Sequence, residues 1–219
     1  MANTDAFTYV YELLLDHFGY QGWWPGETPF EIAVGAVLTQ NTNWQNVAKA
    51  IDNLKVMNWL SYEALAVAPM EELAEAIRPS GYYNLKARRL KNLLAMISRE
   101  YDGELSFLLS DKTESARHNL LSVKGVGPET ADAILLYAGN HPVFVIDTYT
   151  HRVFSRHGLF PEESDYHEMQ QEFIDRLPND HQLFNEYHAL IVMVSKEYCK
   201  KKNPLCEACP LKGVNNYPA

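Results

Sequence analysis

The chain has 219 residues and a formal net charge of −9, with a pI of about 5.3. Hydrophobic residues make up 47% and charged residues 21%, a balance that excludes intrinsic disorder and suits one or two compact domains. Apolar runs such as residues 32–38 are too short to cross a bilayer, and the N-terminus lacks the basic and apolar blocks of a leader peptide. We therefore expect a cytoplasmic, monomeric protein without membrane contact.

Apolar residues recur at helical spacing along most of the chain. Phe7, Val10 and Leu14 predict a first helix that ends near Gly19, and Pro29 suits the first turn of the next helix. Further helices are expected at residues 44–55, 61–67, 69–77, 85–99, 113–121, 128–137, 148–157, 166–176 and 181–198. The only strand-like run, residues 143–146, is too short to make a sheet. The predicted fold class is therefore all-α.

The expected organisation is two helical domains. Residues 28–139 would form a central bundle, and residues 1–27 with 140–219 a second unit built from both chain ends. A cleft between two such units is a usual place for a functional site.

A glycine hairpin joins the two helices predicted at residues 113–121 and 128–137. Gly125 and Gly127 permit positive φ and close approach of an anion to the backbone, and Pro128 fits the first turn of the following helix. The free N–H groups at that helix end attract an anion such as phosphate. A plain interhelical turn is the alternative for a bare Gly-x-Gly.

The net charge of −9 argues against a nucleic-acid partner, because phosphate favours basic surfaces. The charges are unevenly distributed, however. Residues 84–99 carry five cations and no acid, and residues 196–212 carry five lysines, whereas acids concentrate at 162–180. Main-chain N–H donors also bind phosphate on an acidic protein, so the sequence permits a DNA-binding face.

Four motifs occur in the order that a known family shows. They are Leu38-Thr39-Gln40-Asn41-Thr42, Gly81-Tyr82-Tyr83-Asn84-Leu85-Lys86-Ala87, the hairpin at 123–131, and Val145-Ile146-Asp147-Thr148 continuing to Arg152-Val153. Together they resemble the helix-hairpin-helix, or endonuclease III, superfamily of base-excision DNA glycosylases, over about residues 30–209. The resemblance implies a two-domain helical fold and double-stranded DNA with a damaged base as the partner.

Asp147 has two compatible interpretations. By itself it is an N-cap of the helix predicted at 148–157. The resemblance makes it the catalytic carboxylate, which would stabilise the sugar cation as the base departs and activate water. This step needs no metal.

Glu129 stands where the resemblance places a lysine in bifunctional members, which cut the strand through a Schiff base. A carboxylate cannot form that intermediate, and Lys124 lies before the hairpin. The resemblance therefore predicts a monofunctional glycosylase. The alternatives are a bifunctional enzyme for oxidised pyrimidines and a non-catalytic helix-hairpin-helix module that binds DNA.

Three tryptophans lie near the motifs and suggest a base pocket. Aromatic faces bind a flipped, electron-poor base such as an alkylated purine, although packing between domains is the structural alternative. The segments at 23–25, 40–42 and 78–84 resemble the 3-methyladenine DNA glycosylase III branch. The predicted pocket residues are Trp23, Trp24, Pro25, Trp44 and Glu129.

The resemblance also assigns DNA contacts. Gln40 would fill the vacated position in the duplex, and Tyr82 would wedge into the opposite strand. The predicted DNA-binding residues are Gln40, Tyr82, Asn84, Lys86, Gly125, Gly127 and Thr130.

The chain's three cysteines form one local feature. Cys199, Cys206 and Cys209 resemble the first three ligands of the superfamily's 4Fe–4S loop, but Asn215 occupies the position of the fourth cysteine. A cluster on three cysteines with another fourth ligand, a zinc site and an empty remnant all remain open. Lys200, Lys201 and Lys202 of this loop are candidates for phosphate contacts.

Overall fold

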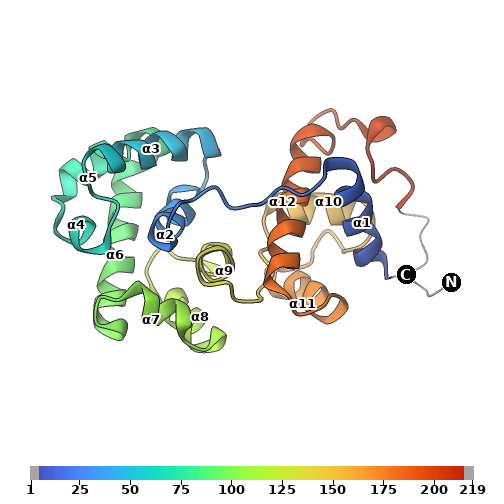
Figure 1. Ribbon diagram of the computed structural model, residues 1–219. Helices are drawn as coiled ribbons and strands as arrows, with labels where there is room; N and C mark the ends of the chain where they lie inside the picture. Colours follow the sequence, from blue (N-terminus) through green and yellow to red (C-terminus); the bar gives the residue numbers. More distant parts are fainter. Residues whose placement is uncertain (1–4, 215–219) are drawn as a thin grey trace. The chain divides into compact units, whose positions relative to one another are not determined.

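The computed structural model describes residues 5–214, and all its regular secondary structure is helical, which confirms the all-α prediction (Figure 1). The chain divides into two compact units. Within the described residues, unit 1 takes 5–23 and 142–214, and unit 2 takes 24–141. The bounds of unit 2 thus differ by a few residues from the predicted 28–139.

Unit 2 is built around the long helix α6, which packs against α2, α5, α7 and α8. Side chains at the N-caps fix where several helices begin: Thr28, Asn43 and Ser61 each accept a hydrogen bond from a backbone N–H three residues ahead. The helices of unit 2 are α2 (Pro29–Leu38), α3 (Trp44–Val56), α4 (Tyr62–Val67), α5 (Met70–Ala76), η1 (Arg78–Ser80), α6 (Tyr83–Tyr101), α7 (Leu105–Ser110), α8 (Thr113–Ser122), α9 (Pro128–Ala133) and η2 (Ile134–Ala138).

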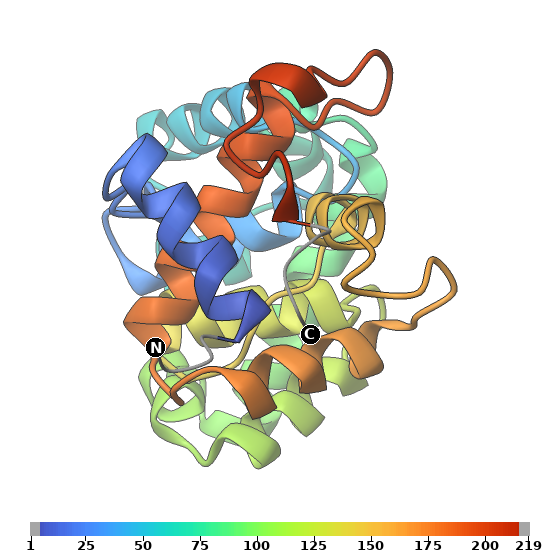
Figure 2. The same cartoon turned by 90° about the vertical axis from the view of Figure 1, so that its right-hand side faces the viewer.

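In unit 1, α12 packs against both α1 and α10. Figure 2 shows α12 beside α1. Its core is aromatic. Phe144 and Phe173 stack with ring centroids 3.7 Å apart, and the buried Tyr187 donates its hydroxyl to the Phe7 carbonyl at 2.7 Å. The helices of unit 1 are α1 (Ala6–Phe18), α10 (Thr148–Arg156), α11 (Tyr166–Arg176), α12 (His181–Glu197) and η3 (Cys206–Ala208).

The structure adds two local features to the predicted helices. The short α7 follows Gly103 and was not expected. The helix predicted at 128–137 changes from α-helical to π-helical at Ile134. Across the described residues, no helix combines the length and apolar character that crossing a membrane requires.

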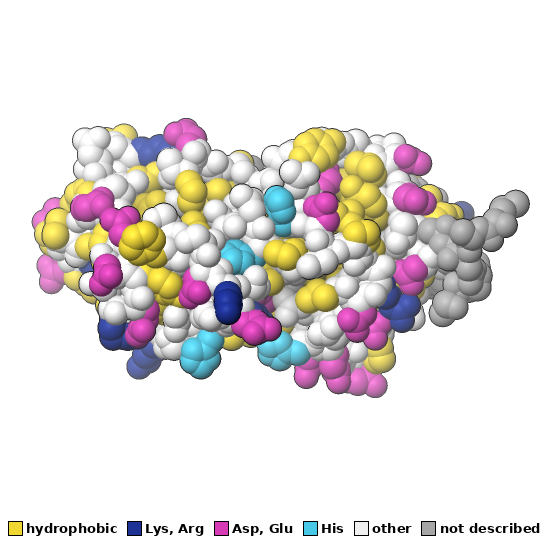
Figure 3. Space-filling view, turned by 60° about the horizontal axis from the view of Figure 1, so that its bottom comes forward, with side chains coloured by type: hydrophobic (Ala, Val, Ile, Leu, Met, Phe, Trp, Pro, Cys, Tyr) yellow, Lys and Arg dark blue, Asp and Glu magenta, His cyan; other side chains and the backbone are white. Residues whose placement is uncertain are grey.

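The acidic side chains are concentrated as the sequence suggests. Figure 3 shows them crowded at the lower edge of the unit that contains α11, whose first turn and N-cap carry Glu168 and Asp165. The part of the chain around α11 is therefore rich in acidic residues.

Candidate active site and DNA-binding hairpin

The hairpin between α8 and α9 is held from both sides. Arg117 of α8 makes a two-pronged ion pair with the buried Asp132 of α9, at 2.7 and 3.0 Å. Val126, between the two glycines, is buried and anchors the loop in the core of unit 2. Gly127 is the N-cap of α9, which has no side-chain cap, so the first N–H groups of this helix are suited to an external acceptor.

The two glycines differ in their surroundings. Gly125 has φ +101°, and a Cβ added there would lie 2.4 Å from Cγ of Arg89. Gly127 has an ordinary extended backbone, and nothing lies within 4 Å of the position of its Cβ. Gly125 is therefore required by the fold, whereas Gly127 leaves open space on the outer side of the hairpin.

Gln40 is bound to the hairpin in this structure. Its amide nitrogen donates to the Gly125 carbonyl at 3.1 Å and to Oγ1 of the buried Thr130 at 2.9 Å. Arg89 of α6 donates a hydrogen bond to Oε1 of Gln40. A role of Gln40 in filling the duplex stays a prediction, and it requires these bonds to break. The side chain of Thr130 is buried, and a contact of this residue with DNA stays a prediction.

The structure contradicts a phosphate contact by Lys86. Its side chain is buried, and its ammonium donates to the carbonyls of Leu38 at 2.8 Å and Ser80 at 2.6 Å. Burial, with a smaller contribution from Arg89, lowers the pKa of Lys86 to about 8. Lys86 is thus a structural residue that ties α6 to the end of α2 and to η1.

The cations of the run at 84–99 differ in exposure: Lys86 is buried, Arg89 and Lys91 are half-buried, and Arg88 and Arg99 are exposed. Lys91 caps the end of α4 by donating to the carbonyls of Leu65, Ala66 and Ala68 at 2.7 to 2.8 Å. The spacing of apolar residues predicts the helix that carries Lys86 and Lys91, but it does not show that their ammonium groups bind carbonyls of the protein. The predicted DNA contact of Lys86 is therefore contradicted by its burial, while Arg88 and Arg99 of the same run remain exposed.

Tyr82 is presented to solvent at the start of α6. Its side chain is 70% exposed, and its φ of +46° is an unusual conformation for a residue with a bulky side chain. Asn84, in the first turn of the same helix, is also exposed. Both residues are therefore accessible to DNA, as their predicted roles require.

Three of the predicted pocket residues gather in unit 2. Trp24 lies edge-on to Trp44, with ring centroids 5.2 Å apart, and at 4.9 Å from Tyr137 of the π-helical turn. With Pro25, the two tryptophans line a cavity of about 450 Å³ whose rim also carries Glu27, Glu31, Asp52 and Lys55. The lining thus combines aromatic rings with three carboxylates, of which Glu27 and Glu31 pair with Lys55 at 2.9 and 3.1 Å.

The other two predicted pocket residues lie elsewhere. Trp23 belongs to unit 1, where the ammonium of Lys196 lies 5.9 Å from its ring centroid. Glu129 is exposed in the first turn of α9. Their membership of a base pocket stays a prediction.

Asp147 is the N-cap of α10 and is fixed by two hydrogen bonds. Its Oδ1 accepts from the backbone N–H of Thr150 at 2.7 Å and from Oγ1 of the same residue at 3.0 Å. Its Oδ2 lies 3.5 Å from Nε2 of His188, and 12% of the Asp147 side chain remains exposed. The capping role is therefore observed, and a small part of the side chain remains exposed.

The surroundings of Asp147 favour its ionised form. Burial by itself raises the pKa of this carboxyl, but His188 and the hydrogen bonds from Thr150 outweigh that effect, and the pKa lies below its usual value. Asp147 is consequently a carboxylate at neutral pH. This is the form that stabilises a positively charged sugar and accepts a proton from water.

Two residues of α12 near these positions were missed by the sequence analysis. His188 faces Asp147, and the buried Glu186 accepts hydrogen bonds from the backbone N–H groups of Gln21 at 2.5 Å and Gly22 at 3.1 Å. Glu186 thereby fixes the backbone that leads to Trp23. Both are polar residues on a largely apolar helix, and that contrast is the signal that could have revealed them.

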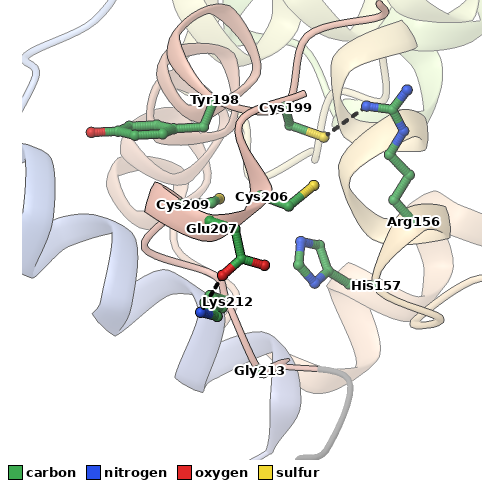
Figure 4. A pocket seen from close by; sticks show the side chains of 9 residues that line it. All are labelled: Arg156, His157, Tyr198, Cys199, Cys206, Glu207, Cys209, Lys212 and Gly213. Atoms are coloured by element: carbon green, nitrogen blue, oxygen red, sulfur yellow. Dashed lines mark hydrogen bonds and ion pairs between the residues drawn. The ribbon is translucent and has the colours of Figure 1, made fainter. Parts of the chain in front are cut away.

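The cysteines line a second cavity, of about 360 Å³, in unit 1 (Figure 4). Cys199 and Cys209 are buried and Cys206 is exposed, and burial raises the pKa of Cys209. Arg156 donates to Sγ of Cys199 at 3.4 Å and to the carbonyl of Lys200 at 2.8 Å. Asn215, at the position of the missing fourth cysteine, lies outside the described residues.

The sequence pattern of the HhH-GPD superfamily of base excision DNA repair proteins matches residues 34–179. This range covers more than half of the chain and includes both the hairpin and Asp147. The chain therefore belongs to the HhH-GPD superfamily, and it is a DNA glycosylase of the endonuclease III superfamily that acts in base excision repair.

Similar sequences cover nearly the whole chain. A Methanocaldococcus jannaschii protein described as "Putative DNA repair glycosylase MJ1434" is 48% identical over 204 residues, which span 93% of this chain and 92% of that protein. Endonuclease III of Thermotoga maritima is 30% identical, over 84% of this chain and 81% of its own length.

Solved structures show the same fold. The 3-methyladenine DNA glycosylase MagIII of H. pylori, bound to 1,N6-ethenoadenine, is 34% identical with a TM-score of 0.72, over 88% of this chain and 98% of that one. A non-covalent complex of endonuclease III with DNA is 25% identical with a TM-score of 0.82, over 98% and 95% of the two chains. These relatives support DNA as the partner of this chain.

Proposed function

We propose that the chain is a monofunctional glycosylase that hydrolyses the N-glycosidic bond of alkylated purines, of the 3-methyladenine type, in duplex DNA. The observation that carries this proposal is Glu129, which occupies the first turn of α9 directly after the hairpin. Bifunctional relatives carry a lysine at this position according to the resemblance described above. A carboxylate cannot attack the sugar to form a Schiff base.

Asp147 supports hydrolysis as the reaction. Its two hydrogen bonds from Thr150 hold the carboxylate in one orientation, and its lowered pKa keeps it charged. A fixed negative charge stabilises the sugar cation more in the transition state than in the ground state, and it orients the attacking water. An alkylated purine is a good leaving group because its ring is already positively charged.

The aromatic cavity of unit 2 supports the choice of substrate. The rings of Trp24 and Trp44 offer π-faces to a flipped base, and Glu27, Glu31 and Asp52 outnumber Lys55 on the same cavity. Although Glu27 and Glu31 pair with Lys55, the lining keeps an excess of negative charge. An electron-poor, cationic ring gains from both the aromatic faces and this charge, whereas a neutral oxidised pyrimidine gains little from the charge. The similarity to MagIII, whose structure contains a purine derivative, points in the same direction.

The bifunctional alternative is tested by borohydride trapping. Duplexes with an alkylated purine or an oxidised pyrimidine are incubated with the protein and borohydride, and covalent adducts are separated by denaturing electrophoresis. Endonuclease III serves as the positive control. We expect base release from the alkylated duplex without an adduct. An efficient adduct on either duplex would establish a lyase and refute the proposal.

A further inference from the structure

Two side chains outside the hairpin fix the orientation of its peptide groups. Gln40, two residues after α2, donates to the carbonyl of Gly125 at 3.1 Å, and Asn92 of α6 donates to the carbonyl of Lys124 at 2.9 Å. In a planar trans peptide the N–H points opposite to the C=O. Because the carbonyl of Lys124 is turned towards Asn92, the N–H of Gly125 is directed away from Asn92. The hairpin is therefore shaped by its neighbours as well as by its own glycines.

Gln40 also ties the hairpin loop to the helix that follows it. The amide nitrogen that binds Gly125 donates to Oγ1 of Thr130, in the first turn of α9, at 2.9 Å. The peptide group between Gly125 and Val126 is held at its other end too, because the Val126 N–H donates to the carbonyl of Val123 at 3.0 Å. The position of the loop relative to the N-terminus of α9 therefore depends on one glutamine side chain.

Arg89 of α6 fixes which way the Gln40 amide faces. Its guanidinium donates to Oε1 of Gln40, and a guanidinium can only donate, so the amide nitrogen of Gln40 faces the hairpin. With the amide turned by half a rotation, its oxygen would face the carbonyl oxygen of Gly125, and these hydrogen bonds would be lost. Within residues 5–214, Arg89 forms no ion pair, and its Nε is buried without a hydrogen bond. The contact with Gln40 is thus the polar contact that holds this arginine.

We propose that Gln40 and Arg89 are positioning residues for DNA binding by the hairpin. Arg89 orients the Gln40 amide, and Gln40 holds the loop against α9 in the arrangement that takes up a phosphate. This role rests on the hairpin as the DNA contact and not on the identity of the damaged base. It differs from the predicted role of Gln40 in filling the duplex, because it acts before any base leaves the helix and on undamaged DNA as well.

The test measures binding of an undamaged duplex by Gln40→Ala, Gln40→Glu, Arg89→Met and the double variant Gln40→Ala/Arg89→Met. Gln40→Glu keeps the acceptor for Arg89 but loses the donor to the hairpin. Asn53→Ala is the matched control, because Asn53 donates one side-chain amide bond to the carbonyl of Ala76, outside the hairpin. Fluorescence anisotropy gives the affinity, and amide hydrogen exchange gives the protection of residues 124–130. Neither measurement depends on glycosylase activity, so failure here is distinct from failure of the proposed function.

We expect each single variant at Gln40 or Arg89 to bind the duplex roughly five- to tenfold more weakly, as for one lost hydrogen bond, and to lose exchange protection in residues 124–130. The double variant should bind no more weakly than the weaker single variant, because both residues act through the same contacts. Asn53→Ala should keep the affinity and the protection.

Four results would overturn the proposal. The first is wild-type affinity in Gln40→Ala, and the second is unchanged exchange protection of the hairpin in that variant. The third is an equal loss of affinity in Asn53→Ala, which would indicate general destabilisation. The fourth is a double variant whose losses add, because Arg89 would then act on DNA independently of Gln40.

Discussion

The two glycines of the hairpin are predicted to have separable roles. In Gly125→Ala, the φ of +101° places alanine in a region that costs about 1–3 kcal/mol. The new Cβ also lies 2.4 Å from Cγ of Arg89, so Arg89 has to move. That movement breaks its hydrogen bond to Gln40, which contributes about 1.5–3 kcal/mol as a bond to a charged group. We expect unit 2 to lose about 3 kcal/mol or more, equivalent to roughly 6–12 °C in Tm.

Gly127→Ala is the matched control for stability. Its backbone is extended and its surroundings are open, so its stability is expected to stay within about 1 kcal/mol of the wild type. The added methyl group nevertheless stands where a phosphate approaches the N–H groups of α9, and DNA affinity is expected to fall. Calorimetry measures the unfolding of both variants, and fluorescence anisotropy measures binding to an undamaged duplex. Equal Tm values for the two variants would refute this division of roles.

Three further predictions follow from the site. Asp147→Asn is expected to keep duplex binding and to slow base release by roughly 100-fold or more in single-turnover assays, because similar losses follow removal of other groups that stabilise a developing charge. An unchanged rate would remove Asp147 from the mechanism. Lys86→Met is expected to lower Tm without changing the salt dependence of DNA binding. Since the pKa of Lys86 falls from an ordinary 10.5 to about 8 on folding, wild-type stability should rise between those pH values, by at most about 3 kcal/mol, and the variant should lack this rise. Tyr82→Ala is expected to change stability by less than about 1 kcal/mol, because its side chain is exposed, yet to slow base release; normal release would exclude the wedge role.

Local rules predicted most of the fold. Helical periodicity located the long amphipathic helices, and short polar residues such as Thr28 and Asn43 act as the caps that their side chains favour. The same rules did not find α7 or the π-helical turn after α9, which places Tyr137 against Trp24. Such features are set by tertiary packing.

The candidate site was predicted less completely, because its support comes from residues distant in sequence. Asp147 and the hairpin were found through motifs, but His188, Glu186 and Arg89 act on them only through the folded chain. For Lys86, by contrast, the sequence predicted a functional contact that the structure does not support. A cation in a basic run was assigned to DNA, although its side chain satisfies two buried carbonyls.

The central claim is hydrolytic removal of an alkylated purine with Asp147 as the charged group. It is tested most directly by incubating methylated duplex DNA with the wild-type protein and with Asp147→Asn, and by measuring the free bases by chromatography. The wild type should release 3-methyladenine and leave an abasic strand that breaks only after alkali treatment, while Asp147→Asn should release little. Absence of alkylated bases from the wild-type reaction, with release from an oxidised pyrimidine duplex instead, would contradict the account.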